Sequence, residues 1–184
     1  MIGMLWVWLL AAQAAVVPGP MATPPGWMQA TRQAEALAKD GKAMEAADIY
    51  EKYSATQPWF PAAHYLRVEL LLSAGRRDLV PPALATARAN VPRDAAMREE
   101  AAMFLKSAAS RPGVARPDAR LLLDEAKSML DEVLKTDPRA RDVLTQKAAV
   151  LEAYAEHVET SAPRRKALQA EADALRERAY AIPR

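Results

Sequence analysis

The chain has 184 residues and a net charge of +2, with no cysteine, six glycines and two histidines. A chain without cysteine forms no disulfide and no thiolate metal site, and a charge near zero argues against a basic nucleic-acid surface. Alanine occurs 41 times and isoleucine three times. Because alanine is the best helix former, this composition predicts an all-α protein.

The N-terminal segment is apolar. Met1–Val17 is interrupted only by Gln13, and the first charged residue of the chain is Arg32. The run is shorter than the roughly 20 residues that span a bilayer. Ala12-Gln13-Ala14 fits the small-x-small pattern of a signal-peptidase site. We therefore predict a cleaved secretory signal over residues 1–17, with an uncleaved membrane anchor or a buried apolar helix as alternatives.

Residues 18–26 hold four prolines and two glycines, which predicts a linker because such a stretch does not hold a helix. The export signal indicates a protein that acts outside the cytoplasm. Abundant alanine, arginine and proline are common in proteins of GC-rich bacteria, so we expect a bacterial periplasm. Contact with the membrane is expected only if residues 1–17 stay uncleaved.

A period of 34 residues follows the linker. Gly41 and Gly75 are 34 residues apart, and so are Pro58 and Pro92. Glycine ends a helix by adopting the left-handed conformation, and proline stops the next helix. Each glycine–proline pair therefore predicts one helical hairpin. A single hairpin does not bury its own apolar face, so we expect neighbouring hairpins to stack.

The first hairpin resembles a tetratricopeptide repeat, a family with small, large and aromatic residues at fixed places around a glycine turn. Those places hold Ala34, Leu37, Gly41, Ala46, Tyr50 and the closing Pro58. The resemblance covers residues 27–92. Tyr53 stands where the family has a small residue, which implies looser packing there.

The second unit follows the pattern less closely. We expect a helix over 61–74, with Leu66, Leu70 and Leu71 as its apolar stripe. Asp78 is expected to cap the next helix, with Pro81-Pro82 in or near its first turn. Leu84 and Ala87 take family positions there, whereas Val80 stands at a position that the family keeps small.

Residues 93–184 predict two longer, divergent hairpins, the second of which ends in a C-terminal cap. Asp94 is expected to cap a helix that ends near Ala109, and a second helix runs over 117–136 after a loop at 110–116. The final hairpin repeats apolar residues every three or four positions, at Leu144, Ala148, Leu151, Ala155 and Val158 and then at Leu168, Ala172, Leu175, Ala179 and Ile182. We therefore expect an α-solenoid of about four antiparallel hairpins, with a plain helical bundle as the alternative.

Sequence motifs for catalysis are missing. His64 and His157 have no second histidine at metal-ligand spacing, and the chain contains no HExxH, no GxSxG and no Gly-x-Gly. Neighbouring carboxylates such as Glu99-Glu100 and Asp131-Glu132 face different directions on a helix and indicate solvated faces. We expect no catalytic residues, no cofactor and no metal, and keep an enzyme on a helical scaffold as the least favoured alternative.

The tetratricopeptide resemblance implies a concave groove that binds a protein or peptide through the first helix of each hairpin. The positions so implied are Glu35, Lys39, Tyr65, Glu69, Glu99, Met103 and Lys106. Tyr65 is expected to be the strongest contact, since aromatic anchors dominate interfaces. The alternative for Tyr65 is packing between repeats.

A basic cluster, Arg164-Arg165-Lys166, lies near a predicted helix N-terminus, where positive charge opposes the helix dipole. It indicates a contact with an acidic partner or with anionic headgroups, or else a solubilising cap offset by Glu171 and Asp173. The sequence as a whole predicts a non-enzymatic, exported adaptor that binds another protein. A membrane-anchored accessory subunit of a larger envelope complex is the second hypothesis.

Overall fold

The computed structural model describes residues 23–183, which form eight α-helices and one short 3₁₀ helix and contain no strand. In chain order the helices are α1 (Trp27–Lys39), α2 (Ala43–Thr56), α3 (Pro61–Ser73), η1 (Arg77–Leu79), α4 (Val80–Asn90), α5 (Ala95–Ala109), α6 (Arg116–Thr136), α7 (Arg141–His157) and α8 (Ala162–Tyr180). The all-α prediction is confirmed. The predicted signal or anchor over 1–17 lies outside the described residues, as does most of the linker.

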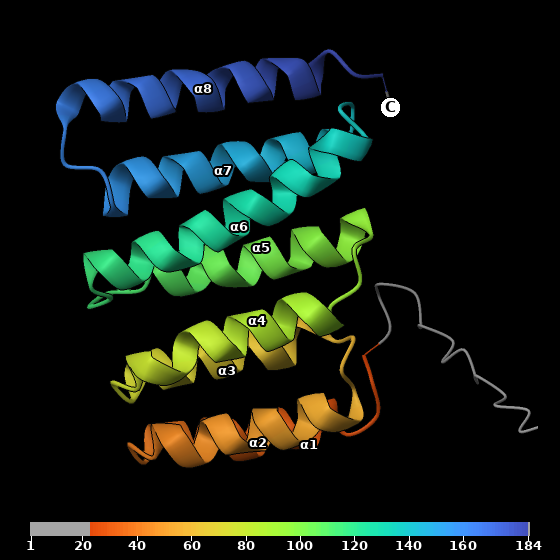
Figure 1. Cartoon of the computed structure of the whole chain (residues 1–184), viewed down its shortest axis with the longest axis vertical. Coiled ribbons are helices and arrows are strands. Elements are labelled where there is room, and N and C mark those ends of the chain that lie inside the picture. Colours follow the sequence, from red (N-terminus) through yellow and green to blue (C-terminus); the bar gives the residue numbers. More distant parts are fainter. Residues whose placement is uncertain (1–22, 184) are drawn as a thin grey trace, which may run out of the picture.

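The helices follow one another along the long axis of the molecule, from α1 and α2 at one end to α8 at the other (Figure 1). Helices that are neighbours in the chain pack together, with the exception of α4 and α5, which share little contact. In addition, α3 packs on α5 and α5 packs on α7. These three alternate helices therefore form a continuous layer through the middle of the molecule.

The two glycines of the 34-residue period end α1 and α3 in the same way. Gly41 has φ 75° and Gly75 has φ 72°, both in the left-handed region. One residue further on, the Lys42 amide donates to the Leu37 carbonyl at 2.9 Å and the Arg76 amide donates to the Leu71 carbonyl at 2.8 Å. These bonds define a Schellman motif at each turn. The predicted glycine turns are confirmed.

The side chains of the first hairpin that carry the tetratricopeptide resemblance pack against one another. Ala34, Ala46 and Tyr50 are buried together, and Leu37 covers them from α1. The small residues on facing helices bring the two helices close together, and the tyrosine ring fills the space beside them. The period in the sequence therefore corresponds to a physical contact between α1 and α2.

Looser packing was expected at Tyr53, but the structure shows that its ring is packed among other aromatic rings. Its ring lies 5.3 Å from Trp27 and 6.3 Å from Phe60, and its hydroxyl donates to the Pro25 carbonyl at 3.1 Å. Trp27 and Phe60 make an edge-to-face contact at 4.8 Å. This aromatic cluster takes the place of the small residue and joins the start of α1 to the α2–α3 connection.

The start of α4 differs from the prediction. Asp78 lies inside η1 and pairs with Arg76, and no side chain of the described residues caps α4. Pro81-Pro82 lies in the first turn of α4 as expected, because proline tolerates positions that lack an intrahelical amide bond. The Asp78 prediction was wrong because the arginine two residues earlier engages the carboxylate.

The helices after residue 93 begin and end close to the predicted positions. The Asp94 carboxylate accepts from the Met97 amide at 3.1 Å and caps α5. Apolar side chains spaced three or four residues apart along α6 are buried, namely Leu122, Ala126, Met129 and Val133. At the far end, α7 and α8 share a separate cluster made of Leu144, Ala148, Leu151, Ala172, Leu175 and Ala179.

Candidate functional site

Two of the predicted groove residues meet at one cavity between α1 and α3. This cavity, which we call the α1–α3 pocket, has a volume of about 190 Å³. Glu35 reaches it from α1, Tyr50 from α2 and Glu69 from α3, and Arg111 reaches it from the loop between α5 and α6. The remaining lining residues are mostly apolar: Thr31, Ala34, Ala38, Leu66 and Leu70. The pocket thus combines charged groups with an apolar wall.

The charged groups of the pocket influence one another. Glu69 pairs with Arg111 and is itself mostly buried. Burial raises the pKa of the Glu69 carboxyl, and the Arg111 guanidinium lowers it in part. Burial also raises the pKa of the Tyr50 hydroxyl, with further contributions from Glu35 and Glu69, while a nearby Thr31 hydroxyl lowers it. Tyr50 therefore stays protonated and can donate or accept a hydrogen bond in the pocket.

One polar atom at the wall of the pocket lacks a partner. The Thr31 hydroxyl oxygen is buried, and among residues 23–183 it forms no hydrogen bond of normal geometry, although Tyr50 lies close to it. A buried hydroxyl without a partner is unfavourable. Contacts within residues 23–183 therefore do not supply a hydrogen-bond partner for the Thr31 hydroxyl.

A second cavity adjoins the first and shares Glu69 and Arg111 with it. Its volume is about 430 Å³, and it lies among the end of α3, η1 and the loop before α6. Arg77 and Asp118 line it and form an ion pair at 2.7 Å. The Glu69–Arg111 pair therefore separates two hollows on this side of the molecule.

Tyr65 corrects the sequence analysis. Its side chain is only 2% exposed, and its hydroxyl donates to the sulfur of Met129 in α6 at 3.6 Å. A side chain so placed has no surface for a partner, so its expected role as the strongest contact of a groove was wrong. The alternative of packing between helices accounts for its position, because α3, α5 and α6 enclose it in the central core.

The other implied groove residues do not join the pocket. Lys39 is exposed at the end of α1, and Met103 is 50% exposed on α5. Lys106 and Glu99 are half-buried. Burial raises the pKa of Glu99, with a further contribution from Asp142 of α7. Glu35 and Glu69 are therefore the members of the implied set that the fold brings into one cavity.

The basic cluster Arg164-Arg165-Lys166 is exposed in the first turn of α8. Arg165 and Lys166 line an open hollow of about 680 Å³ together with Glu152 and Glu156 of α7. The acidic side chains of α7 offset the positive charge on this surface. This arrangement is compatible with the solubilising cap and does not single out an acidic partner.

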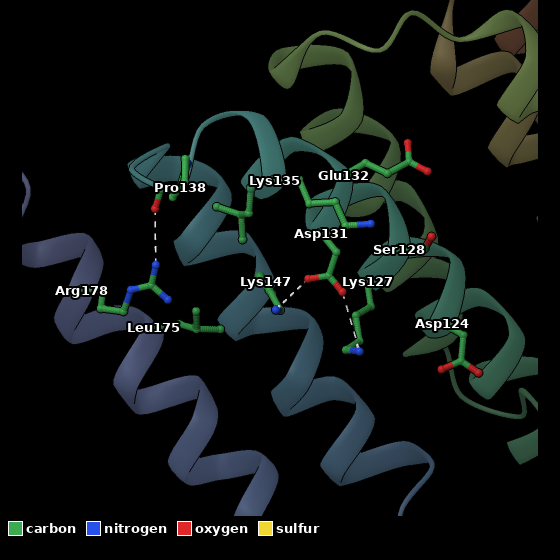
Figure 2. A pocket seen from close by; sticks show the side chains of 11 residues that line it. Asp124, Lys127, Ser128, Asp131, Glu132, Lys135, Pro138, Lys147, Leu175 and Arg178 are labelled. Atoms are coloured by element: carbon green, nitrogen blue, oxygen red, sulfur yellow. Dashed lines mark hydrogen bonds and ion pairs between the residues drawn. The ribbon is translucent and has the colours of Figure 1, made fainter.

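A further cavity lies between α6, α7 and α8 and has a volume of about 560 Å³ (Figure 2). Lys147 pairs with Asp131 at 2.7 Å, Lys127 pairs with the same carboxylate at 3.7 Å, and Arg178 reaches the Pro138 carbonyl at 3.4 Å. The lining contains three acidic side chains (Asp124, Asp131 and Glu132) and four basic ones (Lys127, Lys135, Lys147 and Arg178), so the cavity does not carry charge of one sign. The sequence pattern indicated a solvated face for Asp131, whereas its carboxylate pairs with Lys147 and Lys127.

Neither histidine lies at a site of this kind. His64 is buried, and its Nε2 lies 2.8 Å from the Pro58 carbonyl. Burial lowers the pKa of His64, although the Pro58 carbonyl opposes this effect. His157 is half-buried beside Glu156, at 3.8 Å. His64 therefore helps to hold the α2–α3 connection on α3.

Arg98, in the first turns of α5, is the most unusual buried group. It is 1% exposed, and its three guanidinium nitrogens form no hydrogen bond within the described part of the chain. A Glu132 oxygen lies 3.9 Å from one of them. Nearby, Arg88 of α4 pairs with the buried Glu125 of α6. Polar groups thus occupy the core where α4, α5 and α6 meet.

Within residues 23–183, no helix is long and apolar enough to cross a membrane, and no group of three or more acidic or histidine side chains is arranged to hold a metal ion. Comparisons with known protein families, curated proteins and solved structures find no match. The tetratricopeptide resemblance therefore stays a prediction that depends on the residues and contacts described above.

Proposed function

We propose that the protein is a non-enzymatic adaptor of the tetratricopeptide type, an α-solenoid that binds another protein in the bacterial cell envelope. The observation that carries this proposal is the convergence of Glu35 and Glu69 on one pocket. The resemblance implies that both residues face a partner, and they come from the first helices of successive hairpins. A partner segment lying across α1 and α3 would contact both carboxylates.

The packing of the helices supports the solenoid. The α3–α5–α7 layer is the arrangement expected when the first helices of successive hairpins stack. The matching Schellman turns at Gly41 and Gly75 give the first two hairpins the same reversal of direction.

The cellular location in this proposal depends on residues 1–17 acting as an export signal. A membrane-anchored accessory subunit is the alternative if the segment is retained. Sequencing the N-terminus of the protein isolated from a membrane fraction separates the two. A mature N-terminus after residue 14 is expected for the exported adaptor, whereas retention of Met1 would favour the anchored subunit.

Site-specific photo-crosslinking in cells tests the adaptor. A photoreactive amino acid replaces Lys39 or Met103, both exposed on first helices, and in a matched control it replaces Lys52, exposed on α2. We expect one protein to be captured from Lys39 or Met103 and not from Lys52. Mass spectrometry identifies the captured protein.

A charge reversal in the pocket then tests the site itself. Glu35→Lys is expected to abolish that capture, whereas Glu45→Lys on α2 is expected to leave it unchanged. Equal capture with the photoreactive amino acid at Lys39, Met103 and Lys52, or no capture from any of them, would contradict the proposal that this face binds a partner.

A further inference from the structure

The α1–α3 pocket carries more negative than positive charge. It contains the carboxylates of Glu35 and Glu69 but one guanidinium, that of Arg111. Glu69 pairs with Arg111, whereas Glu35 takes part in none of the ion pairs formed within residues 23–183. The pocket therefore favours a cationic occupant.

The size of the pocket limits that occupant. At about 190 Å³ it is smaller than the roughly 300–1,000 Å³ of sites for drug-sized ligands and cofactors. One long side chain of a partner is a better match in size. The wall has apolar positions for the stem of such a side chain, provided by Ala34 and Ala38 of α1 and by Leu66 and Leu70 of α3.

The chain itself already places a basic side chain at this pocket. Arg111 extends from the α5–α6 loop with its own side chain 54% exposed, and it reaches Glu69, which is 14% exposed. Its guanidinium pairs with one oxygen, Oε1, of the Glu69 carboxylate. Glu35, the Tyr50 hydroxyl and the Thr31 hydroxyl remain as acceptors in the same cavity, and the Thr31 hydroxyl forms no hydrogen bond of normal geometry within residues 23–183.

We propose that the α1–α3 pocket binds a lysine side chain of the partner protein, with the ammonium group at Glu35 and Glu69 and the methylene stem against α1 and α3. This inference rests on the proposed adaptor function and adds the chemistry that the partner presents. Lysine is preferred to arginine because the ammonium is compact and its three donors match a small set of converging acceptors. A long stem with a charged tip also matches an apolar wall next to carboxylates.

Titration with three short probes tests this assignment on the full chain. The probes are acetyl-Ala-Lys-Ala-amide, the same peptide with arginine, and the same peptide with norleucine, which keeps the stem and removes the charge. Binding is followed by amide chemical shifts in ¹⁵N-labelled protein. We expect the lysine peptide to shift α1 and α3 amides, including those of Glu35 and Glu69, and the norleucine peptide to leave them in place.

Charge-removing variants complete the test. Glu35→Gln and Glu69→Gln are each expected to weaken binding of the lysine peptide by at least about tenfold, since charge-assisted hydrogen bonds are the strong ones. Glu45→Gln, on the exposed side of α2, is the matched control and is expected to bind like the wild type. Equal binding of the norleucine or arginine peptide, or no loss in either variant, would overturn the lysine assignment.

Failure of the lysine pocket and failure of the adaptor function give different experimental results. Capture of a partner from Lys39 or Met103 together with no binding of the lysine peptide would leave the adaptor standing and reject the lysine pocket. Binding of the lysine peptide with no captured partner would support the pocket and reject the adaptor as proposed.

Discussion

Aromatic rings pack at the end of the molecule that holds α1 and α2, whereas aliphatic side chains build most of the core from α3 onward. Helices α1 to α4 are 11 to 14 residues long, whereas α5 to α8 are 15 to 21 residues long. Aromatic rings concentrate at the start of the described chain, at Trp27, Tyr50, Tyr53, Trp59 and Phe60. Leucine, alanine, valine and methionine fill the later helices.

This difference explains where the pocket lies. In the middle of the molecule α3 packs directly on α5, and α5 on α7, so side chains fill the space between them. At the first end, α1 packs on α2, and its contact with α3 is slight. A gap remains there, and the α1–α3 pocket occupies it. The short helices at this end thus leave a small gap between α1 and α3 that is lined by apolar and acidic side chains.

The largest expected change in stability comes from a substitution in the aliphatic core of α7 and α8. Leu151 of α7 is 1% exposed in the cluster shared with α8. Leu151→Ala is expected to lower the free energy of unfolding by about 3 kcal/mol, because a buried leucine leaves a cavity. Urea unfolding measures the change. Leu121→Ala, at an exposed position of α6, is the control with an expected loss under about 0.5 kcal/mol. Equal losses would show that the α7–α8 cluster is not a tight core.

A second prediction concerns the core between α4, α5 and α6, where Arg98 is buried and its guanidinium forms no hydrogen bond within residues 23–183. Arg98→Met is expected to raise the free energy of unfolding by about 2 kcal/mol, since an apolar side chain removes an unsatisfied buried charge. Arg88→Met is the matched comparison and should lower it, because Glu125 would stay buried without its partner. Thermal unfolding of both variants measures the signs. A destabilising Arg98→Met would mean that the guanidinium has partners in solution.

The smallest expected effect tests the periodic half. A Cβ at Gly41 or Gly75 would meet no atom of the described chain within 4 Å, so only the left-handed backbone conformation opposes a side chain there. Gly41→Ala and Gly75→Ala are each expected to cost about 1 kcal/mol, measured by urea unfolding. Asparagine at the same positions should cost less, because it tolerates that conformation. Unequal costs at the two turns would argue against one repeated geometry.

Local patterns in the sequence predicted most of the helices. Asp94 marked the start of α5 because an aspartate that precedes an apolar helical pattern accepts from the first amides. The three-to-four spacing of leucine and alanine marked the buried faces of α7 and α8, since that spacing follows the helical period. Asp78 failed for a reason that spacing does not contain, namely competition from the neighbouring Arg76.

The site was harder to predict because tertiary packing decides it. Glu35 and Glu69 were implied by the tetratricopeptide resemblance, and their separation of 34 residues agrees with equivalent positions in two hairpins. Arg111 was missed because it lies in a loop and reaches the pocket from a third hairpin. Tyr65 was misplaced because its helix packs on neighbours from several directions, and a one-helix pattern does not separate a groove face from such an interface.

The layered packing described above also has a kinetic consequence. Among the described helices, extensive packing never joins two helices that are more than two places apart in the chain. Folds with such local contacts have low contact order and typically fold within about microseconds to milliseconds. The end hairpins have neighbours on one side only, so they are expected to open before the middle, as hydrogen exchange would report. A ligand in the α1–α3 pocket would then close one fraying end and slow the exchange of α1 first.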